Sequence, residues 1–272
     1  MPRLSAHGAS ALREGGLTTG RVHPIWGLFE IAVMAGLFLV VLWVVGPHVG
    51  SNSAALAFYW ATLAIWAVVI VWLSPIVLHR DAPGLRGWGG GRSPDDPGAV
   101  PNAWRAYAGL TAIAAVALMV AVVVRDPAFA VHTRWPRVAR KLLIYLVYGP
   151  IQALVFFGYI QTRVRTALGA FARGRLTGRP MVALLTAALF AGAHAPNWPL
   201  VLLTFVAGIA WSWLYYARPS VLLLGVSHAV LGTIVYSLLG ISTRIGPFYA
   251  HPEGHIVRDA IPGLSALVGD LF

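Results

Sequence analysis

The sequence contains no cysteine among its 272 residues. Disulfide bonds, thiolate nucleophiles and cysteine-ligated zinc sites are therefore excluded. Charge is also scarce, because only 11% of the residues are charged, whereas roughly one quarter is usual in soluble domains. Hydrophobic residues make up 58% of the chain and gather in apolar runs that are long enough to span a bilayer. These features predict a membrane protein and exclude a soluble enzyme, a nucleic-acid-binding domain and a disordered tail.

Carboxylates are the scarcest charged groups, with nine Asp and Glu residues in the whole chain. None lies between Asp126 and Glu253, a stretch that holds four of the predicted helices. A hydrolase with paired carboxylates, or a two-metal site built within those helices, is therefore excluded. Histidine is the remaining conventional acid–base group there near neutral pH.

The net charge of +11 comes almost wholly from arginine, since Lys141 is the single lysine. Most of these arginines lie between the apolar runs, where the positive-inside rule and anionic headgroups place them. The lipid bilayer is therefore the expected partner, and nucleic acid is not. Arg3, Arg13 and Arg21 precede the first apolar run, which predicts a retained signal anchor with a cytoplasmic N-terminus. We expect a multi-pass protein of the cell membrane.

The apolar runs must be helical, because a lipid-exposed strand would leave its backbone polar groups unpaired. The sequence thus predicts an all-α, polytopic membrane helix bundle with about seven transmembrane helices. The predicted spans are residues 25–45, 54–78, 104–124, 142–160, 181–195, 200–217 and 220–241. The expected divisions are a cytoplasmic tail (1–24), a transmembrane helix pair (25–78), a flexible loop (79–103), a transmembrane core (104–245) and a C-terminal tail (246–272).

Ionisable and polar groups inside these spans are the candidates for function, because burying them in a membrane is costly. His194 and His228 fall at the end of the fifth span and in the middle of the seventh. Glu30 is the one carboxylate inside a span, and the interpretation favoured for it is a side chain that extends to the headgroups. On the fourth span, helical spacing predicts one polar face that continues to the cytoplasmic end, formed by Tyr145, Tyr148, Gln152, Tyr159 and Arg163.

Three motifs together resemble a known family. Phe190 and His194 form a Phe-x-x-x-His motif, His228 begins a second histidine motif, and Gln152 to Phe157 stand where a Glu-Glu-x-x-x-Arg motif is expected. The set resembles the CPBP family of CAAX-prenyl-protease and bacteriocin-processing intramembrane proteases, over residues 149–233. The resemblance implies a multi-helix membrane endopeptidase that cleaves a membrane-embedded or lipidated peptide or protein near the bilayer surface.

The resemblance also implies roles for individual residues. It makes His194 the activator of water, His228 the oxyanion donor, and Gln152 the residue that replaces the family's catalytic glutamate. Gly232 replaces the family's final Asn, and Arg163 is one turn beyond the expected arginine, which is Phe157 here. Since an amide cannot act as a general base, His194 would act alone as the base, unless Glu30 on the first helix reaches it.

Two alternatives stay open from the sequence. The first is a non-catalytic CPBP homologue, or pseudoenzyme, that binds a membrane peptide or partner protein. The second is a haem or quinone membrane protein with His194 and His228 as axial ligands. No metal site is predicted from the residues, since two histidines fall short of the usual three protein ligands of catalytic zinc. The family resemblance leaves zinc open as a cofactor, and the cofactor is otherwise unknown.

Overall fold

A computed structural model describes residues 24–48, 53–79, 103–171 and 175–246. The described residues form a helical bundle with no strand, which confirms the predicted all-α fold. Its helical segments are α1 (Pro24–Leu39), η2 (Val40–Val45), η3 (Gly46–His48), α2 (Ser53–Val68), η4 (Val69–Leu78), α4 (Ala103–Arg125), α5 (Phe129–His132), α6 (Trp135–Ala153), η5 (Leu154–Ile160), α7 (Gln161–Phe171), α8 (Arg175–Gly192), α9 (Trp198–Ala217), α10 (Val221–Thr233) and η6 (Ile234–Leu238). The expected N-terminal tail, and most of the predicted loop and C-terminal tail, lie outside the described residues.

Six helices in the described part of the chain are long and apolar enough to cross a bilayer, and a shorter apolar helix covers Gly178–Gly192. This agrees with the prediction of about seven spans. Large apolar side chains point outward from these helices, for example Ile113, Val124 and Leu143, which are 73%, 78% and 66% exposed. In water such a surface would be costly, whereas in a bilayer it is the face that contacts lipid.

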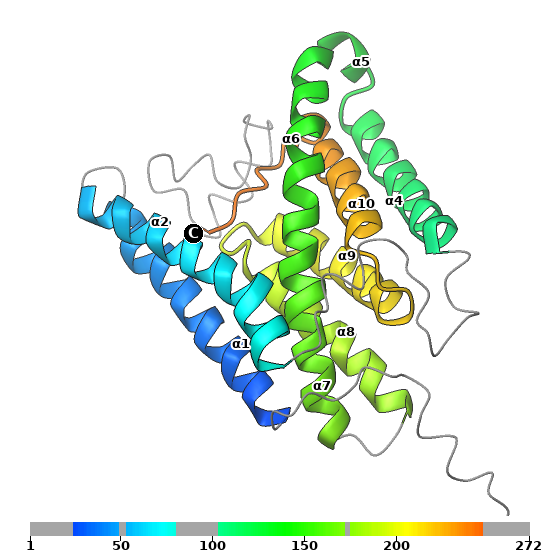
Figure 1. Cartoon of the computed structure of the whole chain (residues 1–272). Helices are drawn as coiled ribbons and strands as arrows, with labels where there is room; N and C mark the ends of the chain where they lie inside the picture. Colours follow the sequence, from blue (N-terminus) through cyan, green and yellow to red (C-terminus); the bar gives the residue numbers. More distant parts are fainter. Residues whose placement is uncertain (1–23, 49–52, 80–102, 172–174, 247–272) are drawn as a thin grey trace, which may run out of the picture.

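A long helical rod runs through the centre of the bundle, formed by α6, η5 and α7 (Figure 1). Its apolar part, Trp135–Leu168, has 34 residues and is longer than the roughly 20 residues that span a bilayer. The predicted span, residues 142–160, was therefore too short at both ends. The first turns of the rod include Arg137, Arg140 and Lys141, which precede the predicted span. The Lys141 ammonium lies 4.8 and 3.8 Å from the ring centroids of Tyr145 and Tyr236.

Helices α6 and α10 cross at two glycines. A side chain on Gly225 would meet the backbone of Pro150 at 2.6 Å, and Gly149 is equally close to the backbone of α10. Further along, Gly232 of α10 faces Tyr145 of α6, so the two helices are antiparallel. Small residues of this kind let membrane helices approach closely. The crossing fixes His228, which is one turn after Gly225.

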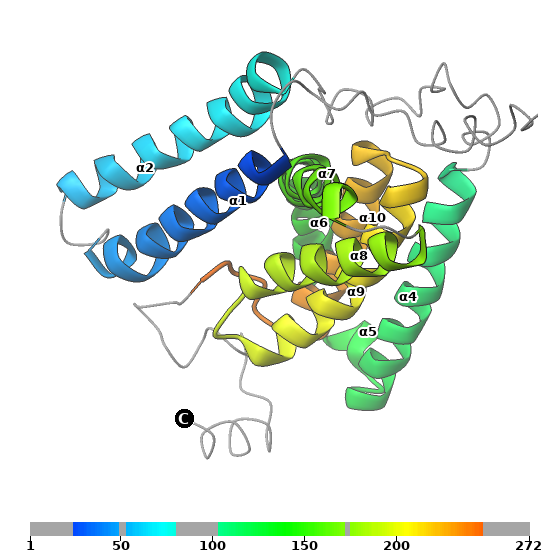
Figure 2. The same cartoon turned by 90° about the horizontal axis from the view of Figure 1, so that it is seen from below.

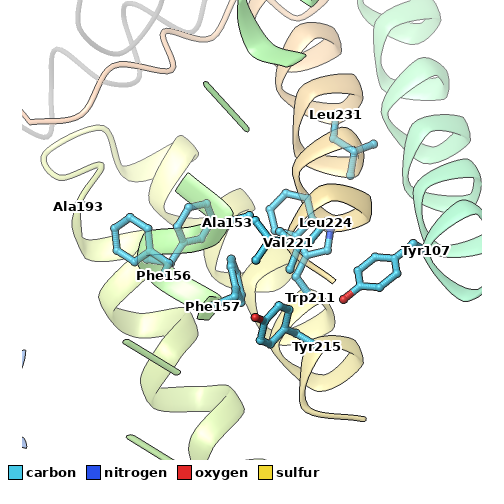
Figure 3. Close-up of a cluster of buried hydrophobic side chains, with 11 residues drawn as sticks. Tyr107, Ala153, Phe156, Phe157, Ala193, Trp211, Tyr215, Val221, Leu224 and Leu231 are labelled. Atoms are coloured by element: carbon cyan, nitrogen blue, oxygen red, sulfur yellow. The ribbon is translucent and has the colours of Figure 1, made fainter. Parts of the chain in front are cut away.

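Aromatic side chains fill the core between α6, η5, α8 and α9. Phe156 and Phe157 of η5 pack against Phe190 of α8 with ring centroids 5.1 and 5.7 Å apart, and Trp211 of α9 lies 6.0 Å from Phe190. Figure 3 shows Phe156, Phe157 and Trp211 gathered in this cluster. Because these rings come from three separate helices, they hold those helices in one arrangement around Phe190.

The N-terminal hairpin of α1 and α2 lies beside the bundle, with α1 against α7 (Figure 2). Gly27 allows this contact, since a side chain there would lie 3.4 Å from the Arg163 Cδ. The hairpin is largely exposed to the surroundings and meets the bundle at its Pro24 end, where Glu30 is located.

Candidate functional site

His194 lies in the turn that joins α8 to α9. The predicted fifth span extended to residue 195, whereas α8 ends at Gly192 and the next helix begins at Trp198. Asn197 caps α9, because its side-chain oxygen accepts a hydrogen bond from the Leu200 N–H at 3.2 Å. This cap explains why the chain turns here instead of continuing the helix, and it leaves His194 on an irregular segment of backbone.

The two histidines converge on one aromatic ring. Phe190 contacts both His194 and His228 edge-on, with ring centroids 5.5 and 5.8 Å apart. Trp211 lies 5.3 Å from His228 on another side. His194 is only 3% exposed, whereas His228 is partly exposed. The structure thus brings together two imidazoles that are 34 positions apart in the sequence.

The imidazole of His194 forms a hydrogen bond with backbone. Its Nδ1 lies 3.3 Å from the carbonyl oxygen of Arg244. Burial lowers the pKa of His194 to about 4, and the hydrogen bond to Arg244 acts in the opposite direction. His194 is therefore neutral at pH 7. A carbonyl is only an acceptor, so the proton of the neutral ring is on Nδ1 and the lone pair on Nε2.

His228 is held by its neighbours on α9 and α4. The indole N–H of Trp211 donates to the hydroxyl of Ser227 at 2.9 Å, and Ser227 is also hydrogen-bonded to Thr111 of α4 at 2.7 Å. Gly232 leaves space beside the imidazole, since a side chain there would lie 3.6 Å from the His228 Cδ2. The indole and the glycine therefore flank His228 on two sides.

Gln152 lies on α6, one turn before Phe156. His194 is one turn after Phe190, and Phe156 and Phe190 pack edge to face. The rod and α8 are antiparallel neighbours joined by a three-residue connection, so Gln152 and His194 lie on the same side of this aromatic contact. Gln152 is 6% exposed, and its Oε1 accepts no hydrogen bond within the described part of the chain.

Glu30 and Arg163 belong to a different cluster. The Glu30 carboxylate accepts hydrogen bonds from Ser74 at 2.6 Å and Tyr159 at 3.0 Å, lies 2.5 Å from the His79 Nε2, and pairs with Arg163 at 3.4 Å. The predicted extension of Glu30 to the headgroups is wrong, because these partners hold the side chain at 16% exposure. We call this group, Glu30, Ser74, His79, Tyr159 and Arg163, the polar junction.

The predicted polar face of the fourth span is split between two sites. Tyr145 is hydrogen-bonded to Thr243, and Gln152 lies on the same side of the Phe156–Phe190 contact as His194, whereas Tyr159 and Arg163 face Glu30. The π-helical segment η5 begins after Gln152 and contains Tyr159, and its i→i+5 hydrogen bonds give it more residues per turn than an α-helix. The α-helical spacing therefore fails across it. The polar junction joins the hairpin to the bundle. Within the described residues, the hydrogen bond of the His194 imidazole is to the Arg244 carbonyl, which is not part of the polar junction.

The described residues contain no group of three His, Cys, Asp or Glu side chains that could hold a metal ion. These described residues therefore do not fit a zinc site with three protein ligands. A haem bound between His194 and His228 would need a flat space where Phe190 now packs against both rings. An open apolar pocket of about 550 Å³ lies elsewhere, between α4 and α9.

Comparison with family models identifies the central part of the chain. Residues 134–234 match the model described as type II CAAX prenyl endopeptidase Rce1-like. This segment is similar to the Rce1-like family. The match supports the CPBP resemblance of the motifs and covers the rod and the helices that carry Gln152, Phe190, His194 and His228. No curated protein and no solved structure matches the chain.

Several residues that contact the Rce1-like segment or the polar junction lie outside residues 134–234, and one of them contacts His194. Thr243 and Arg244 lie beyond residue 234, and Glu30, Ser74 and His79 lie before residue 134. Sequence reasoning missed Arg244, because its carbonyl acts without any side-chain signal. Asn197 between two prolines was a usable signal for a helix cap.

Proposed function

We propose that the protein is an Rce1-like intramembrane endopeptidase that hydrolyses a peptide bond of a membrane-embedded or lipidated substrate near the bilayer surface. His194 is the general base, His228 donates a hydrogen bond to the oxyanion, and Gln152 positions the attacking water. The observation that carries the proposal is the convergence of both imidazoles on Phe190 within the family segment.

The proposed reaction uses these groups in two steps. Nε2 of His194 takes a proton from water, and the resulting hydroxide attacks the carbonyl carbon of the scissile bond. The N–H of His228 donates to the developing oxyanion, and the free amide oxygen of Gln152 accepts a hydrogen bond from the water. The imidazolium of His194 then returns the proton to the leaving nitrogen as the C–N bond breaks, and the new carboxylic acid passes its own proton to the amine, which leaves a carboxylate and an ammonium group.

The low pKa of His194 has a consequence for the rate. A general base is most effective when its pKa is near the working pH, and the pKa of His194 is about 4. With no carboxylate found beside it, His194 remains a weak base. We therefore propose that the enzyme is slow compared with relatives that have glutamate at the position of Gln152.

The test uses the full chain in lipid nanodiscs and a quenched fluorescent peptide that ends in a prenylated CAAX sequence. We expect slow cleavage by the parent and a loss of about 100-fold or more in His194→Ala and in His228→Ala. His132→Ala is the matched control, because His132 is exposed on α5 and its removal leaves the site intact. Unchanged cleavage in His194→Ala would overturn the assignment.

A second candidate function is a non-catalytic homologue that binds a membrane peptide in the same place. The observation that favours it is the uncharged Gln152 where the family has a glutamate. A binder predicts that the probe peptide crosslinks near His228 but is recovered intact, whereas any cleavage that depends on His194 rejects this candidate.

We further propose that the protein lies in the cell membrane with its N-terminus in the cytoplasm, as the arginine distribution indicates. The turn with His194 then faces away from the cytoplasm, because five helical segments, the last of them the short α8, precede it. A chain without native cysteine suits single-cysteine labelling. In intact cells, Arg244→Cys should react with a membrane-impermeant maleimide and Arg165→Cys should not. The reverse pattern would overturn this orientation.

A further inference from the structure

The segment after η6 crosses the turn that contains His194. We call residues 241–246 the strap. Three hydrogen bonds connect it to this turn: Asn197 Nδ2 donates to the Ser242 carbonyl at 2.9 Å, the Gly246 N–H donates to the Ala193 carbonyl at 3.0 Å, and His194 Nδ1 lies 3.3 Å from the Arg244 carbonyl. The strap thus touches the turn on both sides of His194.

The strap is also fixed just before its start and at its centre. Arg125 of α4 donates to the carbonyl of Leu239, just before Gly240 turns the chain with a φ of 69°. At the centre, Thr243 is hydrogen-bonded to the hydroxyl of Tyr145 on α6. The strap is therefore held by α4, α6 and the α8–α9 turn together. This network fixes the position of the Arg244 carbonyl.

We propose that the strap is a positioning element that fixes the tautomer of His194, with the proton on Nδ1 and the lone pair on Nε2. This deepens the proposed function and rests on His194 being the base. The Arg244 carbonyl takes the place on the imidazole that a carboxylate occupies in a Ser-His-Asp triad. In such a triad, loss of the correct tautomer lowers kcat by about 10⁴.

The partner of the His194 imidazole is a backbone carbonyl from outside the family segment, and not a carboxylate. Between Asp126 and Glu253 the sequence has no carboxylate to orient the imidazole. Because Nδ1 faces the Arg244 carbonyl, Nε2 is on the side of the ring away from the strap. The lone pair on Nε2 therefore points away from the strap. A neutral carbonyl orients the ring without adding negative charge, so it sets the tautomer and leaves His194 weakly basic.

Two substitutions loosen the strap without removing a proposed catalytic side chain. Asn197→Ser keeps a residue that caps α9 but loses the amide that holds Ser242. Tyr145→Phe removes the hydroxyl that holds Thr243. The matched control is Tyr107→Phe, which removes a buried hydroxyl that donates to the Arg218 carbonyl at 3.0 Å on a different part of the bundle.

The experiment measures the His194 tautomer by ¹⁵N NMR of the histidine-labelled full chain in nanodiscs, with His194→Gln to assign the signal. Cleavage of the prenylated CAAX peptide is measured on the same samples. We expect one protonated Nδ1 and one unprotonated Nε2 in the parent and in Tyr107→Phe. Asn197→Ser/Tyr145→Phe should show a mixture of tautomers and a kcat lowered by about tenfold or more, with an unchanged KM. Each single variant should show a smaller change in the tautomer ratio and in kcat. The single variants keep the test valid if the double variant does not fold.

The outcomes separate this inference from the proposed function. An unprotonated Nδ1 in the parent, or an unchanged tautomer in the strap variants, would overturn the strap proposal. A mixed tautomer with unchanged kcat would overturn its positioning role. If the strap variants show a mixture of tautomers but the parent cleaves no peptide, the result would support the proposal that the strap fixes the His194 tautomer. The same result would count against the proposed function.

Discussion

The pairing of Glu30 with Arg163 yields a quantitative prediction about stability. Arg163 is 1% exposed and Glu30 is 16% exposed, so both charges are largely removed from water. Removing one partner of a buried ion pair typically costs about 3–5 kcal/mol. We expect Glu30→Leu to lower the free energy of unfolding by about this amount. At roughly 2–4 °C per kcal/mol, Tm falls by about 6–20 °C.

The reverse substitution should cost less. In Arg163→Met the Glu30 carboxylate keeps its hydrogen bonds from Ser74 and Tyr159 and its contact with the His79 imidazole. In Glu30→Leu, by contrast, the Arg163 guanidinium loses the Glu30 carboxylate and keeps its hydrogen bonds to the Ser74 hydroxyl. The double variant Glu30→Leu/Arg163→Met leaves neither charge and should therefore be more stable than Glu30→Leu alone.

The assay is thermal unfolding in nanodiscs, followed by tryptophan fluorescence. His132→Gln is the control, since His132 forms an exposed pair with Asp126 and such pairs contribute little. We expect its Tm to be unchanged. A double variant whose loss equals the sum of the two single losses would refute the reasoning, because it would show that the two charges do not depend on each other.

Four further predictions concern the helix crossing and the site. Gly225→Ala should destabilise the protein by about 1–3 kcal/mol, because the new side chain meets the Pro150 backbone. The control Gly109→Ala on α4 has open space and should be neutral or stabilising. Equal Tm values for the two variants would contradict the close crossing of α6 and α10. Gln152→Glu should raise kcat at pH 7 by about 100-fold, because it adds a carboxylate beside His194, and an unchanged or lower kcat would contradict the proposed place of Gln152. Since burial lowers the pKa of His194 to about 4, kcat/KM should stay level from pH 7 to about 5 and fall near pH 4, whereas a fall near pH 6.5 would contradict a buried neutral base. The same depressed pKa means that the unfolded chain binds the proton more readily, so stability is full above about pH 6.5 and is lost as the pH falls toward 4.

The apolar runs were enough to predict the helical membrane bundle, because backbone groups in lipid must be paired within helices. The pairing of His194 with His228 could be anticipated from the family motifs. The positions of the polar groups on the rod could not, since the π-helical turn η5 changes which residues share a face.

The partners of Glu30 and His194 were beyond sequence reasoning for different physical reasons. Glu30 is satisfied by Ser74 and His79, which are more than 40 positions away and become neighbours only when the hairpin forms. His194 is bound by a backbone carbonyl, and every residue carries one, so no residue type marks it.

The most direct test of the central claim is cleavage of the prenylated CAAX peptide by the parent, His194→Ala, His228→Ala and His132→Ala, each in nanodiscs and with the products identified by mass spectrometry. The account predicts one hydrolysed peptide bond in the parent and in His132→Ala, and a loss of about 100-fold or more in the other two variants. Cleavage that survives in His194→Ala, or a peptide left intact by both the parent and Gln152→Glu, would contradict it.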